Sequence, residues 1–229
     1  MMKQTSQPLS NVVDILTELV TKRVSTIQYL ARTHHGNTHW FNTILLTKDD
    51  LKEMYPNAKM MKRSCQFYTL GMSLGQLLEI DSATDFAKAL VQLLAEFDAY
   101  TNDGSKQKMK NIFRKTKKDE ANYSHDPSNG EFVHLCIPHI PHELDYFEVL
   151  YTICDVLVET YHKFILDVDH TTPSYFELVL KCDSKFKKIF AMLSKELDLL
   201  ARNAIKDELK LIDPLSFSNK MTPIDFDPH

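Results

Sequence analysis

Glycine is scarce in this sequence, with only 5 in 229 residues. So few glycines argue against a Gly-rich phosphate-binding loop and against an all-β fold, whose tight turns need residues that adopt positive φ. No apolar stretch approaches the roughly 18 residues that cross a membrane, and Asp14 and Glu18 interrupt the apolar run that a signal peptide would need. These absences favour a helical protein of the cytoplasm, with the nucleus as the alternative.

Several catalytic signatures are also missing. The sequence contains no P-loop, no H-E-x-x-H and no C-x-x-C pair. Glu159 and His162 form one E-x-x-H on a predicted helix, but a di-iron bundle needs two such motifs and two further helical glutamates. The cysteines lie mostly inside apolar helical patterns, which predicts free thiols in a reducing compartment. We therefore predict no enzyme, no cofactor and no metal.

Helical periodicity dominates what is present. Apolar residues recur at spacings of three and four, and capping residues precede several of these segments: Thr47 with Asp50, Ser82 with Asp85, and Thr172 before Pro173. The pattern predicts helices over residues 11–32, 48–55, 57–79, 83–100, 141–168 and 173–211. Two segments suit short strands instead, one within 38–46 and one at 131–137, and the two are candidates to pair.

These elements predict an all-α fold, an antiparallel bundle of about five or six helices with room for one small two-stranded β element. A chain of 229 residues with 43% hydrophobic and 25% charged residues can bury the core of one large domain. We assign residues 1–229 to a single helical domain. It carries a flexible insertion at 101–130 and an extended C-terminal tail at 212–229, where three prolines prevent further helix.

Three histidines and a cysteine lie within nine residues at 134–142. Zinc is bound by such side chains, so a His/Cys site built from 34–39 and 134–142 is the alternative function, that of a metal-dependent enzyme or sensor. The spacing fits poorly, because two prolines stiffen one short run. A structural reading explains more residues: Pro141 takes the first helical position, and Glu143 and Asp145 then occupy a first turn that favours negative charge.

The insertion contains the most uneven distribution of charge in the sequence. Residues 105–118 carry seven positive charges and no acid, so the rest of the chain carries −11 against a total of −4. We predict partner binding through this segment, by Lys106, Lys108, Lys110, Phe113, Arg114, Lys115, Lys117 and Lys118.

The nature of the partner follows from the charge balance. An acidic protein surface suits the insertion best, because the acidic remainder of the chain would be repelled by nucleic acid. Anionic lipid is a further alternative, although three apolar anchors are few for stable attachment. The sequence therefore predicts an intracellular, non-enzymatic adaptor or scaffold subunit that binds other proteins through helix faces and the insertion.

Overall fold

The computed structural model describes the backbone of residues 7–110, 132–166 and 172–213, and the side chains of all of these except 7–11 and 102–110. The elements, in chain order, are α1 (Gln7–His34), β1 (Thr38–Trp40), β2 (Ile44–Leu46), α2 (Lys48–Met54), α3 (Asn57–Leu78), α4 (Ala83–Lys110), α5 (Tyr146–Lys163) and α6 (Pro173–Ile212). The described chain is thus an all-α bundle with one small antiparallel hairpin, as the periodicity predicts.

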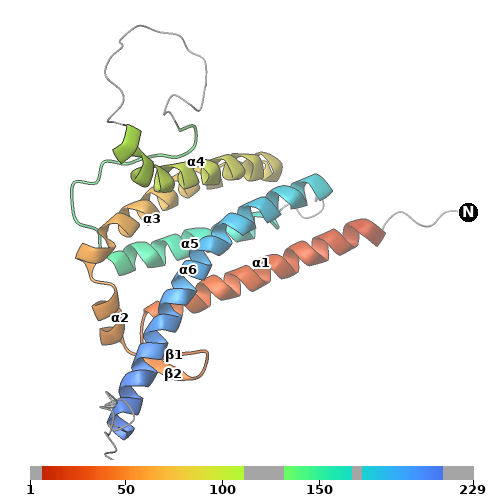
Figure 1. Ribbon diagram of the computed structural model, residues 1–229. Coiled ribbons are helices and arrows are strands. Elements are labelled where there is room, and N and C mark those ends of the chain that lie inside the picture. The colour runs from red at the N-terminus through yellow and green to blue at the C-terminus, as the bar shows by residue number, and fades with distance from the viewer. Residues whose placement is uncertain (1–6, 111–131, 167–171, 214–229) are drawn as a thin grey trace, which may run out of the picture.

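Helix α5 lies at the centre of the bundle. It packs on α3 along one side and on α1 along another, while α6 crosses α1 and α4 (Figure 1). Gly71 of α3 faces α5 at this contact, and a Cβ there would lie 3.4 Å from Ile153 Cδ1. The core is continuous across the helices and includes the fully buried rings of Tyr146, Phe86 and Phe186.

The ends of several helices are those that the sequence predicts. Thr47 and Asp50 form the reciprocal capping box at the start of α2. The Thr172 side chain accepts a hydrogen bond from Tyr175 N at the start of α6, directly before Pro173. These side chains satisfy backbone N–H groups that the first turn of a helix leaves without partners.

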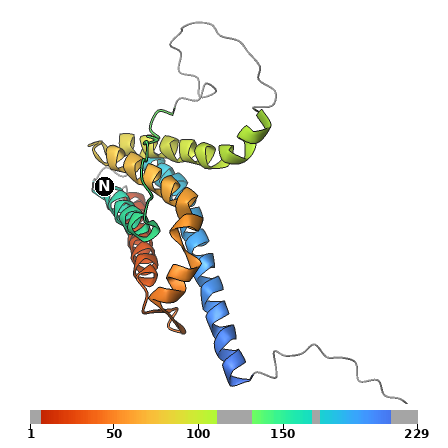
Figure 2. The same cartoon turned by 90° about the vertical axis from the view of Figure 1, so that its left-hand side faces the viewer.

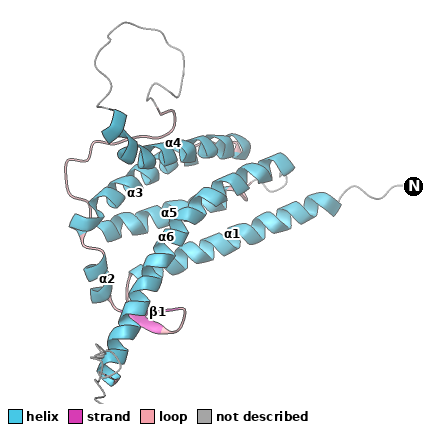
Figure 3. Ribbon diagram, viewed as in Figure 1, coloured by secondary structure: helices cyan, strands magenta, loops and turns pink. Residues whose placement is uncertain are grey.

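The hairpin follows α1 through a tight turn at Gly36, whose φ is +83°. A Cβ at this position would lie 2.8 Å from Lys48 N, so the turn requires glycine. Thr38 pairs with Leu46, and Trp40 pairs with Ile44, beside the lower half of α6 (Figure 3). The predicted strand at 38–46 is therefore two short strands that pair with each other.

Several predicted elements and boundaries differ from the structure. Residues 132–137 form no strand and do not pair with 38–46, because their N–H groups bind side chains of α3 and α4. Helix α5 begins at Tyr146 with Asp145 as its N-cap, not at Pro141. Helix α4 continues to Lys110, ten residues beyond the predicted end, so the first part of the 101–130 insertion has a helical backbone.

Candidate interaction surface

The basic insertion lies mostly outside the described residues. Lys106, Lys108 and Lys110 belong to the last turns of α4, where only the backbone is described. The other predicted contacts fall in the segment 111–131, outside the described residues: Phe113, Arg114, Lys115, Lys117 and Lys118. The tail from 214 onward lies outside them as well. Partner binding through the insertion therefore stays a prediction.

The described residues do not assemble the alternative metal site. The two segments proposed for it, 34–39 and 134–142, are both described, yet no group of three or more His, Cys, Asp or Glu side chains in the described ranges could hold an ion. His34 is buried in α1 with Nδ1 2.7 Å from Leu30 O, and burial lowers the pKa of its imidazole. His35 stacks on Tyr151 with ring centroids 3.9 Å apart. These two histidines serve packing within the bundle.

The segment that leads into α5 is held by one carboxylate. Glu96 of α4 accepts hydrogen bonds from the backbone N–H groups of Val133, His134 and Leu135, at 3.1, 2.9 and 2.8 Å. Burial alone would raise the pKa of Glu96, but the three N–H donors outweigh it and hold the pKa below its ordinary value. Nothing local in the sequence marks Glu96 for this role, because its partners lie nearly forty residues away.

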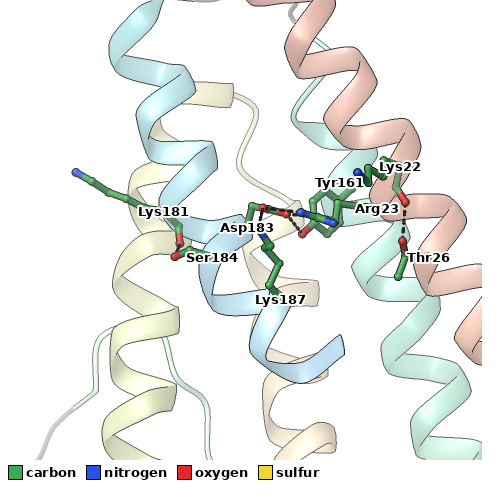
Figure 4. Close-up of polar contacts among 8 residues, drawn as sticks. All are labelled: Lys22, Arg23, Thr26, Tyr161, Lys181, Asp183, Ser184 and Lys187. Carbon is green, nitrogen blue, oxygen red and sulfur yellow. Dashed lines mark hydrogen bonds and ion pairs between the residues drawn. The ribbon is translucent and has the colours of Figure 1, made fainter. Parts of the chain in front are cut away.

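A buried charge pair joins α1 to α6. Arg23 donates to both oxygens of Asp183, at 2.6 and 3.2 Å, and the Tyr161 hydroxyl of α5 donates to the same carboxylate at 2.9 Å (Figure 4). The Asp183 side chain is only 5% exposed, and this is the one buried acid among the described residues. The contact with Asp183 raises the pKa of Arg23, so the guanidinium stays charged.

A second polar cluster joins α3 to α6. Arg63 and Glu196 form a two-point pair at 2.7 and 2.8 Å, and both side chains are about three-quarters buried. Tyr55 and Tyr146 stack beside the pair, but their hydroxyls make no hydrogen bond of normal geometry within the described chain. Burial raises the pKa of Tyr146 to about 12, so this phenol stays neutral near pH 7.

These clusters favour a structural role over a catalytic one. A catalytic acid or base works best with a pKa near the working pH, whereas burial moves the pKa of Tyr146 away from it. The cysteines lead to the same view. All four are free, and burial raises the pKa of Cys154 and Cys182 to about 12, which makes their thiols poor nucleophiles. The polar side chains of the interior tie helices together.

The C-terminal end of α6 exposes more large apolar side chains than the part of the same helix inside the bundle. We call residues 202–212 the α6 extension. Figures 1 and 2 show this end of the helix continuing past the hairpin and away from the other helices. Four large apolar side chains of the extension are exposed: Ile205, Leu209, Leu211 and Ile212. An apolar helix face that no other described residue covers is typical of a site that packs against another molecule.

The tip of the hairpin exposes one more large apolar residue. Phe41 has a φ of +46° and is 66% exposed. This left-handed conformation is uncommon for an aromatic residue, and it is stabilised by a 2.7 Å hydrogen bond from Phe41 N to the Tyr29 hydroxyl. Beside it, Trp40 is buried and donates to Asp198 of α6 at 2.7 Å. The hairpin is thus fixed to α6 while its tip faces outward.

None of the described helices is long and apolar enough to cross a lipid bilayer. Comparison with known proteins gives no match: no family model fits the sequence, no curated protein is significantly similar to it, and no solved structure matches it significantly. The function of the protein therefore has to be inferred from its own residues.

Proposed function

We propose that the protein is a non-enzymatic adaptor or scaffold subunit of the cytoplasm that binds other proteins through exposed helix faces and the basic insertion. The observation that carries this proposal is the α6 extension, which exposes Ile205, Leu209 and Ile212 along one helix. Interior polar groups support it indirectly. Arg23 with Asp183, and Arg63 with Glu196, join pairs of helices, which fits a structural role for these charged side chains of the described chain.

The insertion adds a second contact region to this proposal. Its seven positive charges lie on a chain of net charge −4, so it suits an acidic protein surface better than a nucleic acid. Such a surface would be recruited in a salt-dependent way, because exposed charges are screened over about 8 Å at physiological ionic strength. The apolar face of α6 would then supply contacts that salt does not weaken.

The test is partner capture from cells with three forms of the tagged chain. These are the wild type, a deletion of 104–129, and the triple variant I205S/L209S/I212S. We expect each change to weaken capture of a defined set of proteins, while the thermal melt stays within a few degrees of the wild type because no core side chain is removed. A set of captured proteins that is the same for all three forms would overturn the proposal.

A further inference from the structure

We propose that the α6 extension binds an amphipathic helix whose apolar face is bordered on one edge by carboxylates. This inference rests on the proposed adaptor function and specifies the partner that one of its surfaces takes. Its two supports are an apolar row on α6 that no other described residue covers and a row of positive charges beside it.

The apolar row continues directly from the core. Leu193, Leu197, Ala201, Ile205 and Leu209 recur every four residues on α6, so each lies next to the following one on the helix surface, in a row that winds slowly around the helix. The first three side chains are buried, whereas Ile205 and Leu209 are 40% and 46% exposed, and Ile212 one turn further on is 78% exposed. The row thus stays apolar where the helix extends past the bundle, so its exposed part can pack against another helix as its buried part does.

A basic row runs along one edge of this face. Arg202, Lys206 and Lys210 are also four residues apart, and all three are exposed. Within the described residues Arg202 and Lys206 have no ion pair, and Lys210 pairs only with Asp207 of the same helix, at 2.7 Å between exposed side chains. An exposed pair of this kind contributes little, so the row is open to carboxylates of another molecule.

The charges select this partner over a second copy of the chain. In a two-fold pair of antiparallel extensions the same edges meet, so the basic row would face itself. In a parallel pair the basic row would meet the opposite edge, which offers Glu208 as its only acid. A helix with carboxylates along one edge can pair with all three bases while its apolar side chains cover Ile205 and Leu209, which is a recurring mode of helix recognition.

The same charges disfavour an anionic membrane. Within 202–213 the three bases are matched by three acids, Asp207, Glu208 and Asp213, so the segment has no net charge. Attraction to anionic lipid depends on an excess of Lys and Arg near the surface, and the extension has none. Only a partner that places its acids along one edge benefits from the basic row without meeting Asp207 and Glu208.

The probes are two synthetic helical peptides with identical leucine faces, one with glutamate and the other with lysine at the edge positions. Binding to the full chain is measured by fluorescence anisotropy at low and high salt. We expect the glutamate peptide to bind at least tenfold more tightly, and salt to reduce this ratio. R202E/K206E/K210E should reverse the preference, and I205S/L209S/I212S should abolish binding of both peptides. Circular dichroism of each variant checks that the fold is retained.

Three results would overturn the inference. The first is equal affinity for both peptides. The second is self-association of the wild type in sedimentation that I205S/L209S/I212S removes, which would make a second copy the occupant. The third is binding to phosphatidylserine vesicles that R202E/K206E/K210E removes. The proposed adaptor function fails separately, when partner capture is unaffected both by the deletion of 104–129 and by the triple serine variant.

Discussion

The two parts of α6 share a sequence pattern and differ in surroundings. From Pro173 to Ala201 the helix buries nine side chains against α1, α4 and other elements, whereas from Arg202 to Ile212 none of its side chains is buried. Apolar residues recur at helical spacing in both parts. The comparison teaches that periodicity reports which face of a helix is apolar, but it does not report whether that face is covered by the same chain.

The largest difference in the free energy of unfolding should come from removing one arginine at each part of α6: Arg23 of α1, which binds the packed part through Asp183, and Arg202 of the extension. Arg23→Ala leaves the buried Asp183 carboxylate without its main partner, and breaking a buried pair in this way costs about 3–5 kcal/mol. Arg202→Ala is the matched control, because Arg202 is exposed on the extension, and it should change the free energy of unfolding by less than about 0.5 kcal/mol. Urea unfolding measures both, and equal small effects would mean that the Asp183 pair is not buried in solution.

The same leucine truncation should have different effects twelve residues apart. Leu197→Ala removes a fully buried side chain and should cost about 3 kcal/mol, because it loses apolar burial and leaves a cavity. Leu209→Ala removes an exposed side chain and should cost less than about 0.5 kcal/mol. Thermal melts of the two variants compare them directly, and a large loss for Leu209→Ala would show that the extension is packed.

Substitution of Glu96 shows how much the contact between α4 and the segment before α5 stabilises the fold. Glu96→Gln keeps the shape but loses the charge that binds three N–H groups. We expect it to cost about 1–2 kcal/mol after allowing for partial exposure. Amide exchange of residues 133–135 should become faster. Glu208→Gln on the extension is the control and should leave both quantities unchanged.

The effect of Glu96 should depend on pH in a defined direction. Its pKa is lower in the folded protein than the ordinary value of 4.5, so the carboxylate stabilises the fold above that value. This contribution is lost as the pH falls through the folded pKa. The stability difference between wild type and Glu96→Gln should therefore be constant near neutral pH and shrink on acidification, and a difference that grows in acid would contradict the assignment.

The smallest effect is expected at the start of α6. Thr172→Ala removes the side chain that accepts from Tyr175 N and should cost about 1 kcal/mol. Thr172→Ser keeps the hydroxyl and should cost much less. Because the cap lies at the packed end of α6, its loss should lower the melting temperature of the whole bundle, and a change confined to local helix content would argue against that.

Local signals predicted the helices well. The spacing of apolar residues gave the helical elements, and the capping box at Thr47 and the Thr172–Pro173 pair gave two of their starts to within a residue. These features depend on neighbours within a few positions, so one sequence contains them. The predicted start at Pro141 was wrong because Asp145 binds two N–H groups of the true first turn.

Contacts between distant residues were not predictable in the same way. Arg23 and Asp183 are 160 positions apart, and Glu96 holds a segment nearly 40 positions away. One signal was present: Asp183 interrupts the apolar row of α6, and a charge in such a row needs a buried partner. The described residues of 34–39 and 134–142 form no group of three or more potential metal ligands, because residue types alone do not bring two segments together.

Hydrogen exchange along α6 in the isolated protein compares the packed part of the helix with the α6 extension, because it reports the protection of each amide. We expect slow exchange for amides between Val179 and Leu200, where side chains are buried, and fast exchange between Arg202 and Ile212. Adding the glutamate-edged peptide should slow exchange in the second stretch only. Uniform slow exchange along the whole helix in a monomeric sample would contradict the claim that its last turns lie uncovered.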